Sequence, residues 1–329
     1  MPEYGPYVTD AITDEAVSFI RANKDRPFFA YIAHHAPHSP FCTKEPLMRR
    51  VVEHAPGFQE AFERMKSHTS PAGRKASFEA PNFDFGNFKG TDLDQELLRL
   101  TYLSMLLAVD DGVGRLLDAL TSEGLRENTL IFFLSDNGAA LARPNDLGGV
   151  NLPLRSGKGS VYDGGVRVPF VMSWPGMLPQ GVTNTDATVT SMDIFSTTVE
   201  LAGGTVPADR VIDGVNLIPF LTGEKEGNPH EVLFFRRLGR QAWSLRNGDH
   251  KLDVVTLQPK TLRKGGDARL YPKDGGFYDV RNDVKEVDDL SADFPDKKSA
   301  SRRLYEELTK DFPVPLDTLP GAKPESEDK

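Results

Sequence analysis

Strand-length apolar runs that alternate with helical segments constrain most strongly what this chain can fold into. Three such runs, at residues 28–33, 129–134 and 166–174, end in clusters of polar or turn-forming residues. This alternation predicts an α/β fold with a mostly parallel sheet flanked by helices. Ligands in such sheets bind beyond the carboxyl ends of the strands. We therefore expect a site where 28–33 and 129–134 end.

The helical segments are set by the spacing of their apolar residues. Residues 93–120 carry leucines and other apolar side chains at three- and four-residue intervals, which predicts a long helix ended by Gly124. Shorter amphipathic helices are predicted at 13–24 and 191–202. Residues 42–92 show no sustained period, and we expect a helix and a long loop there.

The pattern changes after about residue 205. Short segments between 232 and 280 alternate with turns and predict a small antiparallel sheet, which an amphipathic helix at 298–312 closes. The domains expected are the C-terminal part of a catalytic α/β domain, a linker, a small α+β subdomain and a disordered tail. Their bounds are 1–204, 205–230, 231–318 and 319–329.

Charge and composition exclude several classes of partner. The formal net charge of −9 argues against nucleic acid or an anionic membrane surface. No apolar run approaches the ~20 residues that span a bilayer. The N-terminus does not resemble a signal peptide. With Cys42 as the only cysteine, nothing fixes the redox compartment or the cellular location.

Asp136-Asn137 follows the second strand directly. A carboxylate beside a carboxamide offers the oxygen ligands that Ca²⁺ or Mg²⁺ prefers, although calcium takes six to eight oxygens. The alternative is an Asx turn before Gly138, with no ion bound. Asp110-Asp111 form a second acidic pair, but they fall within the long helical pattern and are expected to be structural.

Three histidines, His34, His35 and His38, follow the first apolar run. The prolines on either side of His38 stiffen its backbone, so that it can serve in acid–base chemistry or metal binding. For His34 and His35 we favour a structural role, and for His38 both readings stay open.

Lys158 stands between Gly157 and Gly159. Glycines allow the backbone to approach a ligand closely, and the ammonium can neutralise an anion. The Walker and dinucleotide-binding patterns do not fit this segment. The alternative is a solvated lysine in a flexible loop.

Several segments in the same order resemble the formylglycine-dependent arylsulfatase type of the sulfatase family, in the alkaline-phosphatase-like superfamily. They cover nearly the whole chain. The segments are PFFAYIAHHAPHSP, AVDDGVGRLLDAL, TLIFFLSDNG, PLRSGKGSVYDGGVRVPFVMSWPG, DGVNLIPFLTG, WSLRNGDHKL and FYDVRNDVKEVDDL.

The resemblance implies a role for each candidate. Asp136 and Asn137 would supply two of the four side-chain ligands of a calcium ion. Lys158 would bind the sulfate group, and His38 would bind substrate and assist departure of the alcohol. Arg167 lies in a matching segment and is expected to be structural. The implied activity is hydrolysis of sulfate esters, and the implied partner is a small-molecule or glycan sulfate ester.

The chain also departs from the family pattern. Cys42 stands on the wrong side of the histidine loop and lacks the arginine of the Cys/Ser-x-Pro/Ala-x-Arg stretch that is oxidised to formylglycine. We expect no serine to supply that motif, half of the calcium site to be missing, and an N-terminal segment to be absent. The isolated chain is then expected to be inactive. The alternatives are a non-catalytic fragment or pseudoenzyme, and a related phosphonate or phosphodiester hydrolase.

Overall fold

In the computed structural model the chain forms two compact units. The first holds the described residues of 1–131, 140–150 and 174–176, and the second those of 132–139, 151–173 and 177–329. The tail predicted to be disordered lies outside the described residues. The described residues are 7–65, 83–84, 95–141, 148–237, 242–255, 272 and 274–312.

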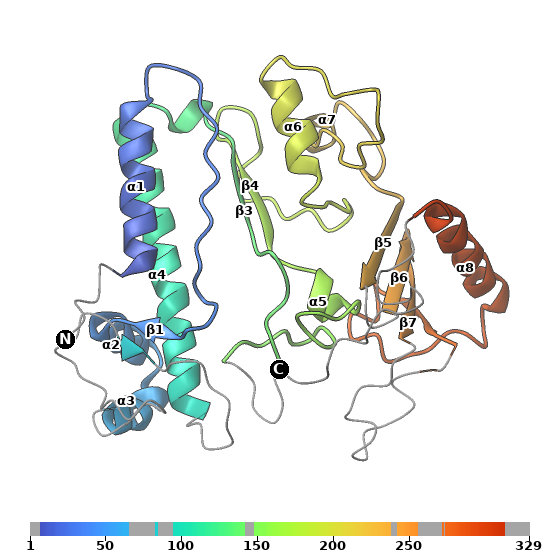
Figure 1. Ribbon diagram of the computed structural model, residues 1–329, viewed down its shortest axis with the longest axis horizontal. Helices are drawn as coiled ribbons and strands as arrows, with labels where there is room; N and C mark the ends of the chain where they lie inside the picture. Colours follow the sequence, from blue (N-terminus) through green and yellow to red (C-terminus); the bar gives the residue numbers. More distant parts are fainter. Residues whose placement is uncertain are drawn as a thin grey trace, which may run out of the picture. The chain divides into compact units, whose positions relative to one another are not determined.

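Two long helices dominate the first unit and lie side by side (Figure 1). Helix α4, Gln95–Ser122, confirms the long helix predicted from the leucine spacing, and Gly124 at φ +72° follows its end. Helix α1, Val8–Ala22, begins earlier than predicted. Thr13, where the helix was predicted to begin, lies inside it, and its hydroxyl donates to the Thr9 carbonyl at 3.0 Å.

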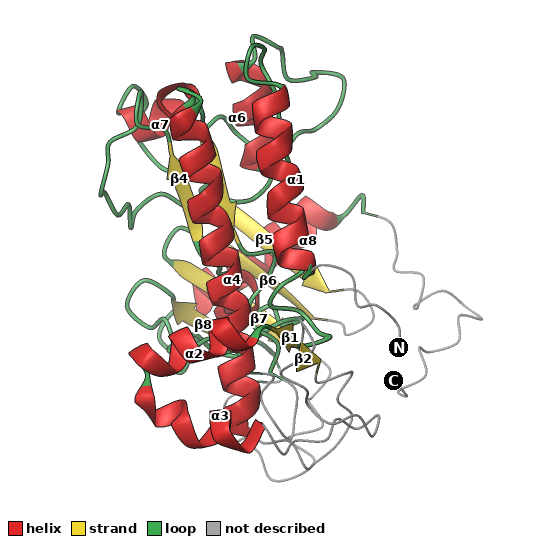
Figure 2. Cartoon of the chain, turned by 90° about the vertical axis from the view of Figure 1, so that its left-hand side faces the viewer, coloured by secondary structure: helices red, strands yellow, loops and turns green. Residues whose placement is uncertain are grey.

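Shorter elements pack around one end of α4 (Figure 2). The apolar faces of two short helices meet α4 in a cluster that includes Met48, Phe62 and Leu97. No helix in the described part of the chain is long and apolar enough to cross a membrane. These short elements are β1 (Cys42–Thr43), α2 (Glu45–His54), η1 (Pro56–Phe58), α3 (Gln59–Met65) and β2 (Phe83–Asp84).

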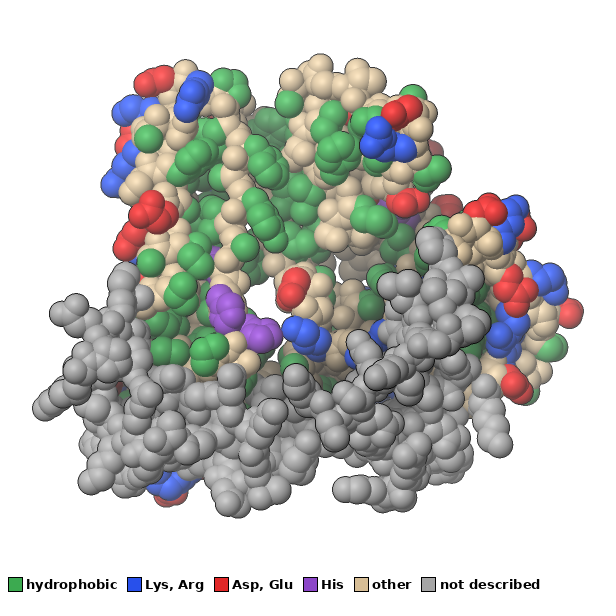
Figure 3. All heavy atoms as spheres, viewed as in Figure 1, with side chains coloured by type: hydrophobic (Ala, Val, Ile, Leu, Met, Phe, Trp, Pro, Cys, Tyr) green, Lys and Arg blue, Asp and Glu red, His purple; other side chains and the backbone are tan. Residues whose placement is uncertain are grey.

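The buried strand predicted at 28–33 is wrong. The segment is neither strand nor helix, and it has no strand partner among the described residues. Phe29 is 66% exposed and Tyr31 is 85% exposed. An apolar run is buried as a strand only where neighbouring strands and helices cover it. Apolar side chains accordingly reach the surface of the face drawn in Figure 3.

In the second unit, β3 and β4 pair as a two-stranded sheet. Strand β3 is Ile131–Leu134, of which Ile131 belongs to the first unit and the other residues to the second. Strand β4 is Phe170–Ser173. Both were predicted from their apolar runs, although β4 is shorter than expected. Helix α6, Asp193–Leu201, confirms the predicted helix. A further helix, α7 (Ile218–Thr222), lies within the segment predicted to be a linker.

The C-terminal antiparallel sheet is confirmed, with the strand order β5-β6-β7-β8. Helix α8, Pro295–Thr309, packs on it through Tyr305, whose ring stacks on Trp243 at 3.8 Å between centroids. Side chains alternate between the faces of β7, so that Leu252 joins an apolar cluster while Lys251 points to the other face. The strands are β5 (Val232–Arg237), β6 (Ala242–Asn247), β7 (His250–Val255) and β8 (Gly276–Asp279).

Candidate functional site

The lysine segment is joined by backbone hydrogen bonds to the turn that follows β3. The Lys158 amide donates to the Ala139 carbonyl at 3.0 Å, and the Gly138 amide donates to the Gly165 carbonyl at 3.1 Å. All four residues belong to the second unit. The structure therefore brings Asp136-Asn137 and Lys158 together, as expected for residues of one site.

The Asn151 carboxamide reinforces this junction. Its oxygen accepts from the Ala139 amide at 2.8 Å, and its nitrogen donates to the carbonyls of Ala139 at 2.9 Å and Ser156 at 3.0 Å. This role could not be predicted from the sequence, since a single asparagine after a valine matches no motif. A half-buried amide that makes three hydrogen bonds to backbone fixes the relative position of the two segments.

The glycines of this region serve close backbone packing. A Cβ on Gly138 would lie 1.7 Å from the Gly164 carbonyl oxygen, and a Cβ on Gly164 would lie 2.3 Å from the Arg155 carbonyl oxygen. Gly159 has φ +79°, a conformation that other residues rarely adopt. These contacts and backbone bonds argue against the flexible loop considered above.

The Lys158 side chain itself is exposed. Its ammonium makes no hydrogen bond or ion pair with the residues that the structure describes, while its backbone is held by Ala139. A lysine fixed at the backbone and free at its charged end is suited to contact an anion.

The Asp136-Asn137 pair offers oxygen donors that the protein does not use. Asp136 is exposed and Asn137 half-buried, and neither side chain hydrogen-bonds to a described residue. The expected Asx-turn alternative is not formed, because the Gly138 amide bonds to Gly165. The donor chemistry suits a hard cation. However, no group of three or more metal-binding side chains occurs in the described ranges, so these two residues alone do not make a calcium site.

His38 lies in the first unit and is exposed. Its Nδ1 lies 2.7 Å from the Ser39 carbonyl oxygen, and its ring meets that of His35 edge-on at 5.2 Å. Because a carbonyl only accepts, Nδ1 carries a proton, and Nε2 is left for other chemistry.

His34 and Asp111, which were expected to be structural, both contact other residues of the first unit. His34 is half-buried, and its ring lies 3.7 Å from where a Cβ of Gly112 would stand. Burial lowers the pKa of His34, whose ring nitrogens have no hydrogen-bond partner in the described structure. Asp111 accepts two hydrogen bonds from Arg50, at 2.5 and 3.0 Å, on the surface of α4.

Comparison with known proteins identifies the class to which this fold and this glycine–lysine segment belong. A model of the sulfatase family matches residues 1–204, and a model described as N-sulphoglucosamine sulphohydrolase, C-terminal, matches residues 157–312. The chain belongs to the sulfatase family. The resemblance inferred from the sequence motifs is thus confirmed.

Individual relatives agree with the family. A sulfatase of Formosa agariphila is 32% identical over 91% of this chain and 48% of its own length. The steryl-sulfatase of Mus musculus is 33% identical over 70% of this chain and 30% of its own. The crystal structure of Ps i-CgsB in complex with k-i-k-neocarrahexaose superposes with a TM-score of 0.70 at 29% identity, covering 95% of this chain and 57% of that one.

The fold comparisons confirm the α/β class predicted from the sequence. A phosphonate monoester hydrolase of Agrobacterium radiobacter shares the fold with a TM-score of 0.58 at 23% identity, covering 92% of this chain and 62% of its own. The chain spans about half the length, or less, of the curated relatives it matches here.

One expectation about the nucleophile motif needs correction from the sequence itself. Ser70-Pro71-Ala72-Gly73-Arg74 fits the Cys/Ser-x-Pro/Ala-x-Arg pattern, so the statement that no serine offers it is wrong. The stretch follows His38 in the chain and lies outside the described residues. The pattern fixes only its arginine, so a match of five residues is weak evidence for the motif.

Proposed function

We propose that this chain supplies the sulfate-contacting part of a sulfate-ester hydrolase site. The observation that carries the proposal is the hydrogen bond between the Lys158 amide and Ala139, which joins the lysine to the Asp136-Asn137 turn. A sulfate ester is negatively charged, and charge is redistributed over the transferring sulfuryl group as the ester bond breaks. The Lys158 ammonium stabilises the negative charge of that group from a backbone that needs no rearrangement.

Asp136 and Asn137 are proposed as two ligands of a calcium ion that needs further ligands from outside this pair. Both side chains are free of hydrogen bonds in the described structure and lie next to the backbone that holds Lys158. When bound, such a cation supplies positive charge to the sulfate oxygens. The two residues alone would hold it weakly, since calcium takes six to eight oxygens.

His38 is proposed as the proton donor to the leaving alcohol, from the family resemblance of its histidine loop. The hydrogen bond from Nδ1 to the Ser39 carbonyl fixes the ring, so that Nε2 is the atom that would transfer the proton. In this step water attacks the sulfur, the ester bond from sulfur to oxygen breaks, and the leaving oxygen takes the Nε2 proton of a His38 that is protonated on both ring nitrogens. The proton that the attacking water loses restores the imidazolium.

The proposed substrate is a small-molecule or glycan sulfate ester. The experiment is to incubate the full chain with calcium and matched 4-nitrophenyl sulfate, phosphate and phenylphosphonate esters, and with sulfated oligosaccharides. Faster release from sulfate esters supports the proposal. Faster release from the phosphonate ester overturns it in favour of the hydrolase class represented by the Agrobacterium enzyme, which shares the fold. Sulfate binding without any turnover supports the non-catalytic alternative.

A further inference from the structure

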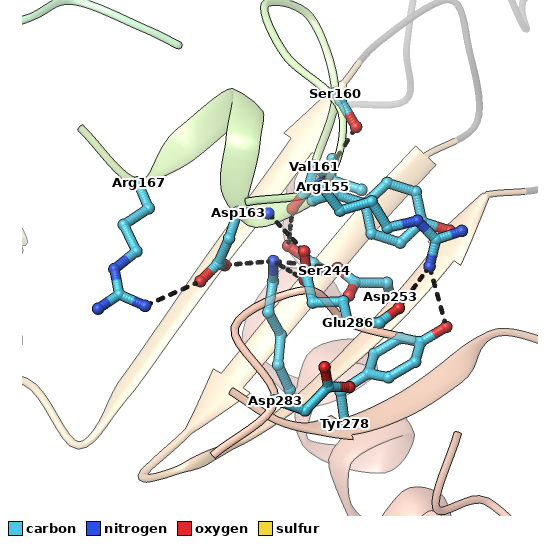
Figure 4. A network of polar contacts seen from close by, with 12 residues as sticks. Arg155, Ser160, Val161, Asp163, Arg167, Ser244, Asp253, Tyr278, Asp283 and Glu286 are labelled. Atoms are coloured by element: carbon cyan, nitrogen blue, oxygen red, sulfur yellow. Dashed lines mark hydrogen bonds and ion pairs between the residues drawn. The ribbon is translucent and has the colours of Figure 1, made fainter. Parts of the chain in front are cut away.

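A fully buried lysine lies at the centre of the second unit. Lys251 on β7 is 1% exposed, and its ammonium donates to Asp163 Oδ1 and Glu286 Oε1, both at 2.7 Å. Asp253, on the same face of β7, lies 3.4 Å from the same ammonium. Figure 4 shows the three carboxyl groups converging from α5 (Asp163–Val166), from β7 and from the loop that carries Glu286.

Three acidic side chains surround Lys251. Burial alone would lower the pKa of Lys251, but the carboxyl groups of Asp253, Asp163 and Glu286 outweigh burial and raise it. Burial raises the pKa of Asp253 well above its usual value. Arg167 approaches the second oxygen of Asp163 at 3.6 Å. Three buried carboxyl groups thus face one lysine and one arginine.

Stability is a poor explanation for such a group. Moving charged groups out of water costs about as much free energy as their mutual attraction returns. Well-packed apolar side chains often stabilise a core equally or better. A buried ionic group does, however, impose one geometry on the segments that it joins. Glu286 also holds φ +51° without being a glycine, a strained conformation that persists where surrounding contacts fix it.

Glu286 holds both ends of the segment that contains Lys158. Its Oε2 accepts from the Asp163 amide at 2.8 Å, and its carbonyl accepts from the Arg155 guanidinium at 2.7 Å. The Arg155 carbonyl in turn accepts from the Gly164 amide at 2.8 Å, which closes the loop. Lys158 therefore lies on a loop whose two ends are tied to one residue of the C-terminal sheet region.

We infer that Lys251 and Glu286 are positioning residues, which fix the 155–166 loop and thereby the anion-contacting Lys158. Both side chains are fully buried. Lys251 orients Glu286 and Asp163, Glu286 holds the loop, and the loop amide of Lys158 holds the turn after β3 through Ala139. The expected effect on anion binding rests on the proposed function of Lys158. The expectation that Lys251 and Glu286 hold the loop in place does not depend on that function.

The test uses the full chain with Glu286→Gln and Lys251→Met. Leu252→Ala is the matched control, because it removes an apolar contact from the opposite face of the same strand. Amide hydrogen exchange over 155–166 and sulfate affinity by titration calorimetry are measured for each. We expect faster exchange in this loop for the two test variants alone, with a loss of sulfate affinity of roughly 10- to 100-fold, as for other supporting residues of binding sites.

A double-variant cycle with Lys158→Met separates positioning from general destabilisation. If Glu286 acts through Lys158, Glu286→Gln adds no further loss of affinity in the Lys158→Met background. Additive losses, or loop exchange no faster than in Leu252→Ala, overturn the inference. Should Lys251→Met fail to fold, Glu286→Gln, which keeps the side-chain size, decides alone. If the unchanged chain binds no sulfate, the proposed function fails, and hydrogen exchange still decides whether the loop is held as inferred.

Discussion

The Ala139 carbonyl accepts a hydrogen bond from the Lys158 amide at 3.0 Å, and this bond helps to join the two candidate elements of the site. On one side stands a lysine whose charged end is free in the described structure, and on the other a turn that carries unused carboxylate and carboxamide oxygens. The arrangement accounts for Gly138, Gly164 and Gly165, because a Cβ at any of the three would clash with a backbone carbonyl oxygen of a neighbouring segment.

Gly138→Ala should destabilise the second unit strongly. The added Cβ would lie 1.7 Å from the Gly164 carbonyl oxygen, and backbone on both sides leaves it no room. We expect a loss of at least about 3 kcal/mol in the free energy of unfolding, measured by urea denaturation.

Gly114→Ala is the control for that variant. Gly114 is exposed on α4, and nothing lies within 4 Å of the position its Cβ would take. Alanine favours a helix over glycine by about 1 kcal/mol, so this change should raise stability. Equal effects of the two substitutions would contradict the close packing described for Gly138.

Acid should destabilise the first unit through His34. Burial lowers the pKa of the His34 imidazole in the folded state, so the unfolded chain binds the proton more readily. This contribution to the free energy of unfolding is fully present above the pKa that His34 has in the unfolded chain. It is lost as the pH falls through the lower pKa of the folded state, by at most about 1.4 kcal/mol per pH unit.

The variant His34→Leu tests this dependence. Neither ring nitrogen has a hydrogen-bond partner in the described structure, so the apolar side chain should be tolerated at neutral pH. Its unfolding free energy should depend less on pH between 7 and 5 than that of the unchanged chain. An identical pH dependence would show that His34 does not titrate in this way.

Asp193 should be the most sensitive polar residue of α6. It is fully buried and accepts from the Thr190 amide at 2.8 Å, the Val215 amide at 2.9 Å and His230 Nε2 at 2.7 Å. Asp193→Ala leaves three half-buried donors unpaired, and we expect a loss of about 3–5 kcal/mol in the free energy of unfolding, measured by heat or urea denaturation. Asp193→Asn keeps one oxygen acceptor, so its free energy of unfolding should fall less than that of Asp193→Ala. An equal loss in the two variants would indicate that the negative charge, not the number of acceptors, matters.

The sequence predicted those parts of the fold that depend on local periodicity. Helix α4 followed from its leucine spacing, and β5 to β8 from short runs between turns. The strand expected at 28–33 failed because burial depends on neighbours, which a run of apolar residues cannot reveal. Tyr31, 85% exposed, shows the difference most clearly.

The candidate site was only partly predictable for a similar reason. Asp136 was singled out because it follows an apolar run directly, and Lys158 because it stands between two glycines. Lys251 was missed, because a lysine that alternates with apolar residues in a strand normally faces solvent, and its partner Asp163 lies 88 residues away in the chain. Pairings over such distances in sequence leave no local pattern.

The most direct test of the central claim is calorimetric titration of the full chain with sulfate, with and without calcium, for Lys158→Ala against the unchanged chain. Lys285→Ala, another exposed lysine of the second unit, is the control. We expect Lys158→Ala alone to weaken sulfate binding by roughly tenfold, the loss of one charge-assisted contact, with unfolding unchanged. Sulfate affinity that is the same in all three proteins would contradict the assignment of Lys158 to the anion.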